Sequence, residues 1–183
     1  LAAHQPLFDP VAHGALDARV ARRRLLHRRL VVARQRAVVG THLLEVEMRV
    51  RSNQMPAALQ LKMPVWTPGS YLIREYERHV QDFDAKNASG ALTWDKVNKN
   101  TWQIDTKGAH EVVATYRVYA NELTVRTNEL NDEHAFWNNA ALLMFPKDQL
   151  KAPSTVTVNP YSNWKVATGL PPDGERGDDG VDV

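Results

Sequence analysis

The sequence of 183 residues contains no cysteine. Disulfide bonds, thiolate zinc sites and cysteine nucleophiles are therefore excluded, although this absence does not fix the compartment. No apolar run approaches the roughly 18 residues that a membrane-spanning helix needs, so we expect no membrane span. The glycine-rich loop that binds phosphates is missing, and so is the G-x-S-x-G turn of serine hydrolases.

Metal-binding patterns are also missing. None of the 7 histidines belongs to a His-Glu-x-x-His sequence, which places two zinc ligands and a general base on one helix. Glu75 and His79 are four residues apart, which on a helix makes a surface pair but not a three-ligand site. The acidic run "NELNDEH" (128–134) is typical of a surface turn, and "DDGVD" (178–182) lacks the spacing of a calcium loop. The sequence thus predicts no catalytic residue, no metal site and no cofactor within this chain.

Positive charge is concentrated at the N-terminus. Residues 1–40 hold eight arginines and two acids, a charge of +6 within a total of +2, which leaves −4 for the rest. We therefore expect no nucleic-acid binding by the folded body. Leu16, Val20, Leu26, Leu30 and Ala33 can share one helical face, so a basic helical leader is one interpretation. A disordered leader, or sequence that is not native to the protein, is the other.

From Thr41 onward the pattern alternates with period two, which is typical of half-buried strands. Leu44, Val46, Met48 and Val50 are predicted to face the core, as are Val112, Ala114, Tyr116 and Val118. The predicted strands are 41–51, 58–63, 80–86, 91–97, 101–105, 110–120, 122–127, 140–145 and 154–159. Short strands at near-regular spacing predict a mainly β protein, an antiparallel β-sandwich or saddle-shaped sheet.

The stretch "MPVWTPGSYLIREYERHVQDF" (63–83) interrupts this pattern. Its prolines fix φ and remove ladder donors, so the preceding strand must end at Met63. Ser70 is predicted to cap a short helical turn. Trp66 and Tyr71 are predicted to bury against the sheet and to fix the exit of the chain.

This stretch, extended to Ala85, closely resembles the N-terminal domain of the M61 family of metallopeptidases, the glycyl-aminopeptidase-like enzymes. The resemblance continues through "KVNKNTWQI" (96–104), "ATYRVYANELTVRTNEL" (114–130), "FWNNAALLMF" (136–145) and "NWKVATGLP" (163–171). Five blocks in order make a specific match. It implies three segments: an atypical arginine-rich leader (1–40), the β domain (41–171) and a linker or truncated end (172–183).

The resemblance implies a non-catalytic domain of a zinc aminopeptidase. In that family the zinc helix lies in the next domain, so zinc is expected in the catalytic domain of the parent protein. That catalytic domain, on the same polypeptide, is the expected partner, and this domain would help to shape the cleft for a peptide substrate. By position, the passage 126–139 approaches the cleft, which makes Asn128, Glu129 and Asn138 candidates for substrate contact.

Two other functions remain open on the sequence. The five tryptophans and the Asn138–Asn139 pair are compatible with a free-standing β-sandwich that binds peptide or carbohydrate. Residues 14–38 are compatible with binding to an anionic surface. Arginines interrupt the apolar stretch that a secretion signal needs, and the sequence does not decide between the cytoplasm and the periplasm of a bacterium.

Overall fold

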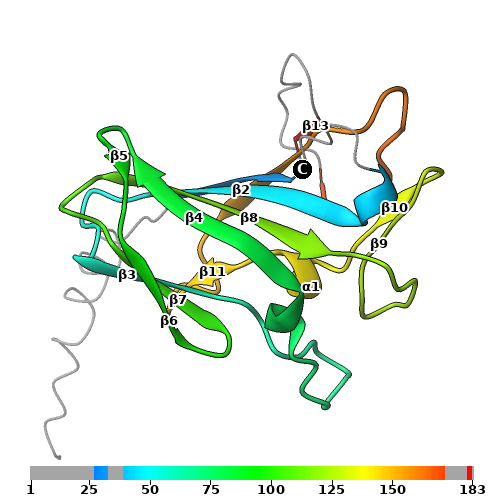
Figure 1. Ribbon diagram of the computed structural model, residues 1–183, viewed down its shortest axis with the longest axis horizontal. Coiled ribbons are helices and arrows are strands. Elements are labelled where there is room, and N and C mark those ends of the chain that lie inside the picture. Colours follow the sequence, from blue (N-terminus) through cyan, green and yellow to red (C-terminus); the bar gives the residue numbers. More distant parts are fainter. Residues whose placement is uncertain (1–26, 33–38, 172–180, 183) are drawn as a thin grey trace, which may run out of the picture.

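A computed structural model of the chain describes residues 27–32, 39–171 and 181–182. The protein is mainly β, as predicted, and its strands form two large sheets and one small one (Figure 1). All pairings are antiparallel except that of β1 with β12. No helix among the described residues is long and apolar enough to cross a membrane.

The larger sheet has seven strands. In spatial order they are β13 (Val181–Asp182), β12 (Ser154–Val158), β1 (His27–Val32), β2 (Leu43–Arg51), β8 (Glu111–Tyr119), β4 (Val80–Asn87) and β5 (Gly90–Ala91). The second sheet contains β11 (Phe145–Pro146), β3 (Ala58–Lys62), β7 (Thr101–Asp105) and β6 (Trp94–Asn98). A hairpin of β9 (Glu129–Leu130) and β10 (Ala135–Phe136) stands apart. The helical pieces are short: η2 (Val39–Thr41), η3 (Tyr76–His79) and α1 (Asn139–Leu142).

Strands β2 and β8 form the centre of the larger sheet, and their alternation explains the core. Their register places the two predicted apolar faces directly opposite each other. The pairs are Leu44 with Val118, Val46 with Tyr116, Met48 with Ala114 and Val50 with Val112. All eight side chains are buried, so the predicted inward faces of both strands are confirmed.

The two large sheets share this core through an aromatic cluster. Phe83 of β4 lies 4.9 Å from Trp94 and 5.5 Å from Trp102, measured between ring centroids. The ring of Tyr116 also stacks on Phe83, at 6.3 Å between centroids. Because Trp94 and Trp102 belong to the second sheet, Phe83 joins the two layers.

The N-terminal segment contributes a strand to this sheet. Residues 27–32 form β1, which pairs antiparallel with β2 and parallel with β12. A helix that includes Leu30 is therefore wrong for these six residues; Leu16, Val20, Leu26 and Ala33 lie outside the described residues. Most of the predicted tail, 172–180 and 183, also lies outside them, while residues 181–182 pair with β12.

Two predicted strands are absent. Residues 122–127 form a loop whose backbone turns on itself, with Thr127 Oγ1 donating to the carbonyl of Glu122 at 2.6 Å. Residues 140–145 begin within α1 and reach a strand only at Phe145. The remaining predicted strands are present, with ends shifted by a few residues.

The stretch that begins at Met63 differs from its prediction in three ways. Tyr71 is 91% exposed and Trp66 is 48% exposed, so neither fixes the chain by burial. Ser70 does not cap a helix, because the helical turn η3 starts only at Tyr76. Glu75 precedes that turn with φ 51° and bonds Lys99 at 2.7 Å, so the predicted Glu75–His79 pair does not form.

Candidate functional site

The predicted contact residues belong to the β9–β10 hairpin, at the right of Figure 1, and to the residues directly beside it. The loop 120–128 leads into this hairpin, and the hairpin leads into α1. Asn128 and Asn138 are brought together, since the Oδ1 of Asn128 accepts a hydrogen bond from the backbone N–H of Asn138 at 3.0 Å. The side-chain amide of Asn128 donates to the carbonyl of Ala141 at 3.0 Å.

Asn138 is the N-cap of α1. Its Oδ1 accepts from the backbone N–H of Ala140 at 2.9 Å, which satisfies one of the free donors at the start of the helix. Its Nδ2 donates to the carbonyl of Val125 at 3.0 Å and so attaches the loop 120–128 to α1. Asn128 and Asn138 therefore form a framework that holds three segments in place.

Glu129 is directed elsewhere. Glu129 begins β9 directly after Asn128, and its side chain takes part in none of the hydrogen bonds that Asn128 and Asn138 make. One carboxylate oxygen of Glu129 accepts from Asn131 Nδ2 at 3.0 Å. Within the described residues no partner bonds its other oxygen. The structure thus pairs two of the three candidates and separates the third from them.

Two hollows flank this framework. One, of about 440 Å³, lies between the side of Asn138 and the segment 166–170, with Val125, Phe136 and Val158 among its walls. The other, of about 240 Å³, lies at η3 and the end of β8 and is lined by Tyr76, His79 and Tyr119 together with Asn128. Sequence reasoning did not identify Tyr76 or Tyr119, because a tyrosine beside a strand is by default a packing residue.

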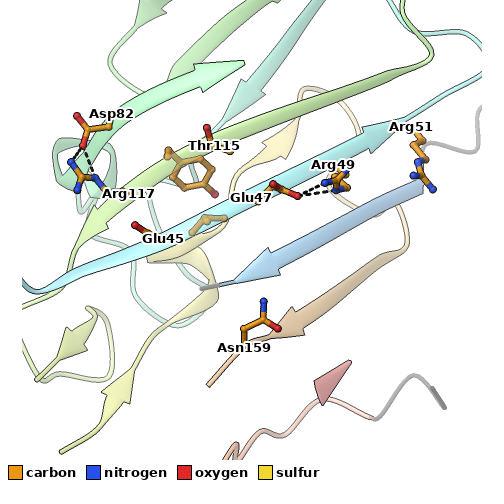
Figure 2. Close-up of a pocket in the computed structure, with 10 residues that line it drawn as sticks. Glu45, Glu47, Arg49, Arg51, Asp82, Thr115, Arg117 and Asn159 are labelled. Carbon is orange, nitrogen blue, oxygen red and sulfur yellow. Dashed lines mark hydrogen bonds and ion pairs between the residues drawn. The ribbon is translucent and has the colours of Figure 1, made fainter. Parts of the chain in front are cut away.

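A further hollow, of about 820 Å³, lies on the face of the larger sheet that points away from the core. Figure 2 shows its charged side chains on β2, β8 and β4, with Arg49 directed at Glu47 and Arg117 directed at Asp82. Arg49 also reaches Glu111 at 3.2 Å, and Arg51 bonds the same carboxylate. These hydrogen bonds, that from Arg51 above all, lower the pKa of Glu111.

Most charged side chains in the hollow of about 820 Å³ are thus paired with one another. Glu45 is the exception among the residues that line it: none of the described residues pairs with its carboxylate, because Arg117 on the facing strand bonds Asp82. Among the described residues that line the hollow there is no histidine and no pairing of a nucleophile with a base. It is an ionic surface on which most of the described charges compensate one another.

Across the described ranges, no three His, Asp or Glu side chains come together in a group that could hold a metal ion. His79 lines the hollow of about 240 Å³, and burial is the main cause that lowers its pKa, followed by the charge of Arg78. The residues present do not fit a catalytic zinc, so no reaction step is assigned to them.

The tryptophans do not form a binding face. Trp102 is buried, and Trp94, Trp137 and Trp164 are half-buried; of the five, Trp66 alone is exposed. The rings of Trp94 and Trp102 pack against Phe83 in the core. The row of exposed aromatic rings that a carbohydrate-binding sheet would present is not found in the described part of the chain. The segment 14–38, apart from the backbone of 27–32, lies outside it.

Exposed large apolar side chains are most frequent on the loop 64–75, and others lie on the loop 120–128 and on β10. We call the group on the loop 64–75 the apolar end, and it consists of Trp66, Tyr71, Leu72 and Ile73. Val125 is 75% exposed and Ile73 65%. An isolated exposed apolar residue is ordinary, but four large ones on a single loop are typical of a surface that another protein covers.

Comparisons with known proteins agree with this architecture. A crystal structure of an aminopeptidase N family protein from Idiomarina loihiensis superposes with a TM-score of 0.72 at 29% identity, over 82% of this chain. This chain spans only 25% of the length of that protein. An M1 zinc metallopeptidase from Deinococcus radiodurans, solved with a Tyr-Ser-Ala substrate, gives a TM-score of 0.41 at 13% identity, covering 73% of this chain and 31% of its own. No curated protein matches the chain.

The sequence profile of the peptidase M61 N-terminal domain matches residues 36–181. This range begins five residues before the β domain predicted from the sequence and ends ten residues after it. It includes β2 to β12 and reaches into β13. The chain therefore belongs to the peptidase M61 family, and its residues 36–181 correspond to the N-terminal domain of that family.

Proposed function

We propose that this chain is the non-catalytic N-terminal domain of a zinc aminopeptidase, that it packs on the catalytic domain of the same polypeptide, and that it shapes one side of the substrate cleft. The family match and the aminopeptidase N family relative support the parentage. Zinc belongs to the catalytic domain in this proposal, since the described residues offer no group of ligands.

The observation that carries the proposal is the apolar end. Tyr71, Leu72 and Ile73 are consecutive and are 91%, 60% and 65% exposed. Covering one such side chain contributes about 1.5–3 kcal/mol, so three of them supply a large share of a domain interface. The chain spans a quarter of its relative, which leaves a large partner on the same polypeptide to cover them.

Within this proposal the three polar candidates have different roles. Asn128 is only 5% exposed, so a substrate cannot reach it, and it acts by positioning Asn138. Asn138 is half-buried beside the hollow of about 440 Å³. Glu129 retains a carboxylate oxygen that the described residues do not bond, which suits a peptide amine. Asn138 and Glu129 are thus the proposed substrate contacts.

The parentage is tested first by the gene. The sequence downstream of codon 183 should encode a His-Glu-x-x-His helix, which places two zinc ligands and a glutamate on one face. The purified 183-residue chain should not hydrolyse glycyl or alanyl amide substrates. Turnover by this chain alone would refute the assignment of catalysis to another domain.

The interface is tested by separating the protein into this chain and the remainder. The remainder should bind the chain in a pull-down and in calorimetry. The double variant Leu72→Ser/Ile73→Ser should weaken that binding by about tenfold or more, because two apolar side chains are lost from the interface. Leu150, which is 68% exposed between β11 and β12, supplies the matched control: Leu150→Ser should bind like the wild type. Equal binding by all three chains would contradict the proposed surface.

A further inference from the structure

Buried polar side-chain atoms without a hydrogen-bond partner are concentrated in one short segment. In the described part of the chain there are three of them: Arg74 Nε, the hydroxyl of Tyr76 and Glu77 Oε2. Folded proteins pair nearly all buried polar groups, so three unpaired groups within four consecutive residues are a sign of strain. Each atom is closed off from the surface, so an external ligand cannot bond it while the segment keeps this conformation.

The backbone of the same segment is strained as well. Glu75, which follows Arg74, has φ 51° and ψ 46°, the left-handed conformation that is costly for a residue other than glycine. Its side chain bonds Lys99 at 2.7 Å, but this ion pair is exposed, and solvent screens it. Residues three positions apart are neighbours on a regular helical turn. Among the ion pairs of the described residues, however, none joins Arg74 to Glu77.

The residues before Glu75 lie between two backbone positions that can act as hinges. We call residues 70–74 the strap. Gly69 has φ 83° and Glu75 has φ 51°, so the chain passes through the left-handed region on either side of the strap. Hinges are a few residues that absorb large changes of φ and ψ. Glycine adopts either sign of φ, and Glu75 loses strain when its φ becomes negative.

The strap is attached only at its ends. The N–H of Ser70 donates to the carbonyl of Thr67 at 3.0 Å, and the N–H of Arg74 donates to the carbonyl of Val65 at 2.8 Å. Between these two bonds, residues 71–73 make no hydrogen bond with any described residue. A segment with few hydrogen bonds and little burial can change its conformation at a small cost in free energy.

We propose that the strap is a conformational device that responds to the catalytic domain, an inference that rests on the proposed function. When that domain covers residues 71–73, Glu75 moves to right-handed helical φ and ψ, and η3 gains one turn at its N-terminal end. Arg74 and Glu77 then lie on one side of the turn and pair, which satisfies two of the three unpaired groups. The separated domain keeps the observed, strained conformation.

The catalytic domain shifts this equilibrium because it binds the two conformations unequally. Rotation about the backbone of Glu75 redirects the side chains of residues 71–73, which are the ones that the proposed interface covers. A partner shaped for one direction binds the other more weakly. The local sequence favours the longer turn, since it places Glu75 four residues before His79, a spacing at which a carboxylate and a histidine face each other on a helix.

The test is a matched pair of substitutions at one hinge. Glu75→Gly favours the left-handed conformation, Glu75→Ala favours the right-handed one, and both remove the same carboxylate. Amide hydrogen exchange at residues 73–77 is measured for both variants, in the 183-residue chain and in the full-length protein. In the chain, exchange should be about fivefold faster for Glu75→Ala, because alanine is strained at positive φ. In the full-length protein the order should reverse by a similar factor, because alanine stabilises a helical turn relative to glycine.

The same measurement separates the strap from the interface on which it rests. The same order of the two variants in both proteins would overturn the strap. It would leave the interface intact, because covering alone slows exchange at residues 71–73 in either conformation. If exchange at residues 71–73 is equally fast in the chain and in the full-length protein, the catalytic domain does not cover them, and both proposals fail.

The strain itself is tested in the 183-residue chain by urea denaturation. Tyr76→Phe removes a hydroxyl that has no partner, so the urea midpoint should stay unchanged or rise. Tyr116→Phe is the matched control. It removes a hydroxyl with two hydrogen bonds and should lower the midpoint. Equal losses in the two variants would show that the hydroxyl of Tyr76 is bonded in solution and would overturn the inference of strain.

Discussion

Asn128 holds Asn138 by a 3.0 Å hydrogen bond from the Asn138 backbone, and Asn138 in turn caps α1 with its own side chain. The two residues are ten positions apart and lie on either side of the β9–β10 hairpin. The hairpin, α1 and the loop 120–128 are therefore joined by hydrogen bonds of side-chain amides, in addition to the backbone hydrogen bonds of the sheets.

Asn128→Ala should destabilise the chain by about 2 kcal/mol, because Asn138 N–H and the buried carbonyl of Ala141 lose their partner. Urea denaturation followed by circular dichroism measures this change. Asn163→Ala, at an exposed position, should shift the free energy of unfolding by less than about 0.5 kcal/mol. Equal effects of the two substitutions would show that the framework does not stabilise the domain.

Tyr116→Phe should cost about 2 kcal/mol at neutral pH. The buried hydroxyl donates to the carbonyl of Leu142 at 3.0 Å and accepts from the N–H of Met144 at 3.1 Å, so its removal leaves two backbone groups unpaired. Thermal and urea unfolding of the variant measure the loss. A change in the free energy of unfolding below about 0.5 kcal/mol would contradict the role of these two hydrogen bonds, which join β8 to the end of α1 and to the segment after it.

The same tyrosine should make the folded state sensitive to alkali. Burial raises the pKa of Tyr116 above that of a free tyrosine, so the folded chain retains this proton when the unfolded chain has lost it. The stabilisation is complete below about pH 10 and falls by about 1.4 kcal/mol per pH unit above it. The difference in stability between wild type and Tyr116→Phe should therefore shrink above pH 10. If the difference in stability between wild type and Tyr116→Phe stayed constant up to pH 11, the raised pKa of Tyr116 would be refuted as the cause of alkali sensitivity.

Phe83→Ala should destabilise the chain by about 3 kcal/mol or more, because a cavity opens between the two large sheets. Trp94 and Trp102 lie against Phe83, so the tryptophan emission of the folded variant should also shift to longer wavelength. Tyr71→Ala removes an aromatic ring that is 91% exposed and should change the stability by less than about 0.5 kcal/mol. Similar costs for both variants would contradict the central position of Phe83.

Glu111→Gln should have a small effect that disappears in acid. Hydrogen bonds from Arg51 and Arg49 hold the pKa of Glu111 below its ordinary value of 4.5. The stabilisation is thus present above pH 4.5 and is lost as the pH falls below it. Its size at pH 7 is at most about 1 kcal/mol, because solvent screens the partly exposed pair. Denaturation at pH 7 and pH 3 should show a difference from wild type only at pH 7.

The core strands could be predicted from the sequence because their apolar residues recur at every second position; Val113 is the one buried residue outside this alternation in β2 and β8. Leu44 to Val50 and Val112 to Val118 face each other in the register that their apolar positions require. The strand prediction failed at 122–127 and 140–145. The residue types there favour strands, but hydrogen bonds to other segments determine the backbone conformation. The side chain of Asn138 bonds the carbonyl of Val125 and caps the start of α1. Neither hydrogen bond can be recognised from a periodic pattern in the sequence.

The site was less predictable than the fold. Asn128 and Asn138 were identified from the family resemblance, but their mutual bond depends on the fold of the hairpin between them. Trp66 and Tyr71 were expected to be buried because large aromatic side chains usually are, and their exposure places them on the surface instead of in the core. The hollow of about 240 Å³ combines side chains from segments more than 40 residues apart, which a local pattern cannot reveal.

The parallel neighbour of β1 is β12, whose partners begin at Ser154, more than 120 residues after Arg28. During synthesis on a ribosome, β1 can therefore acquire this neighbour only when nearly the whole domain has left the exit tunnel. Until then one side of β1 remains an open edge on which other nascent chains can add. We expect chaperones that protect emerging polypeptides to be needed longest at this strand.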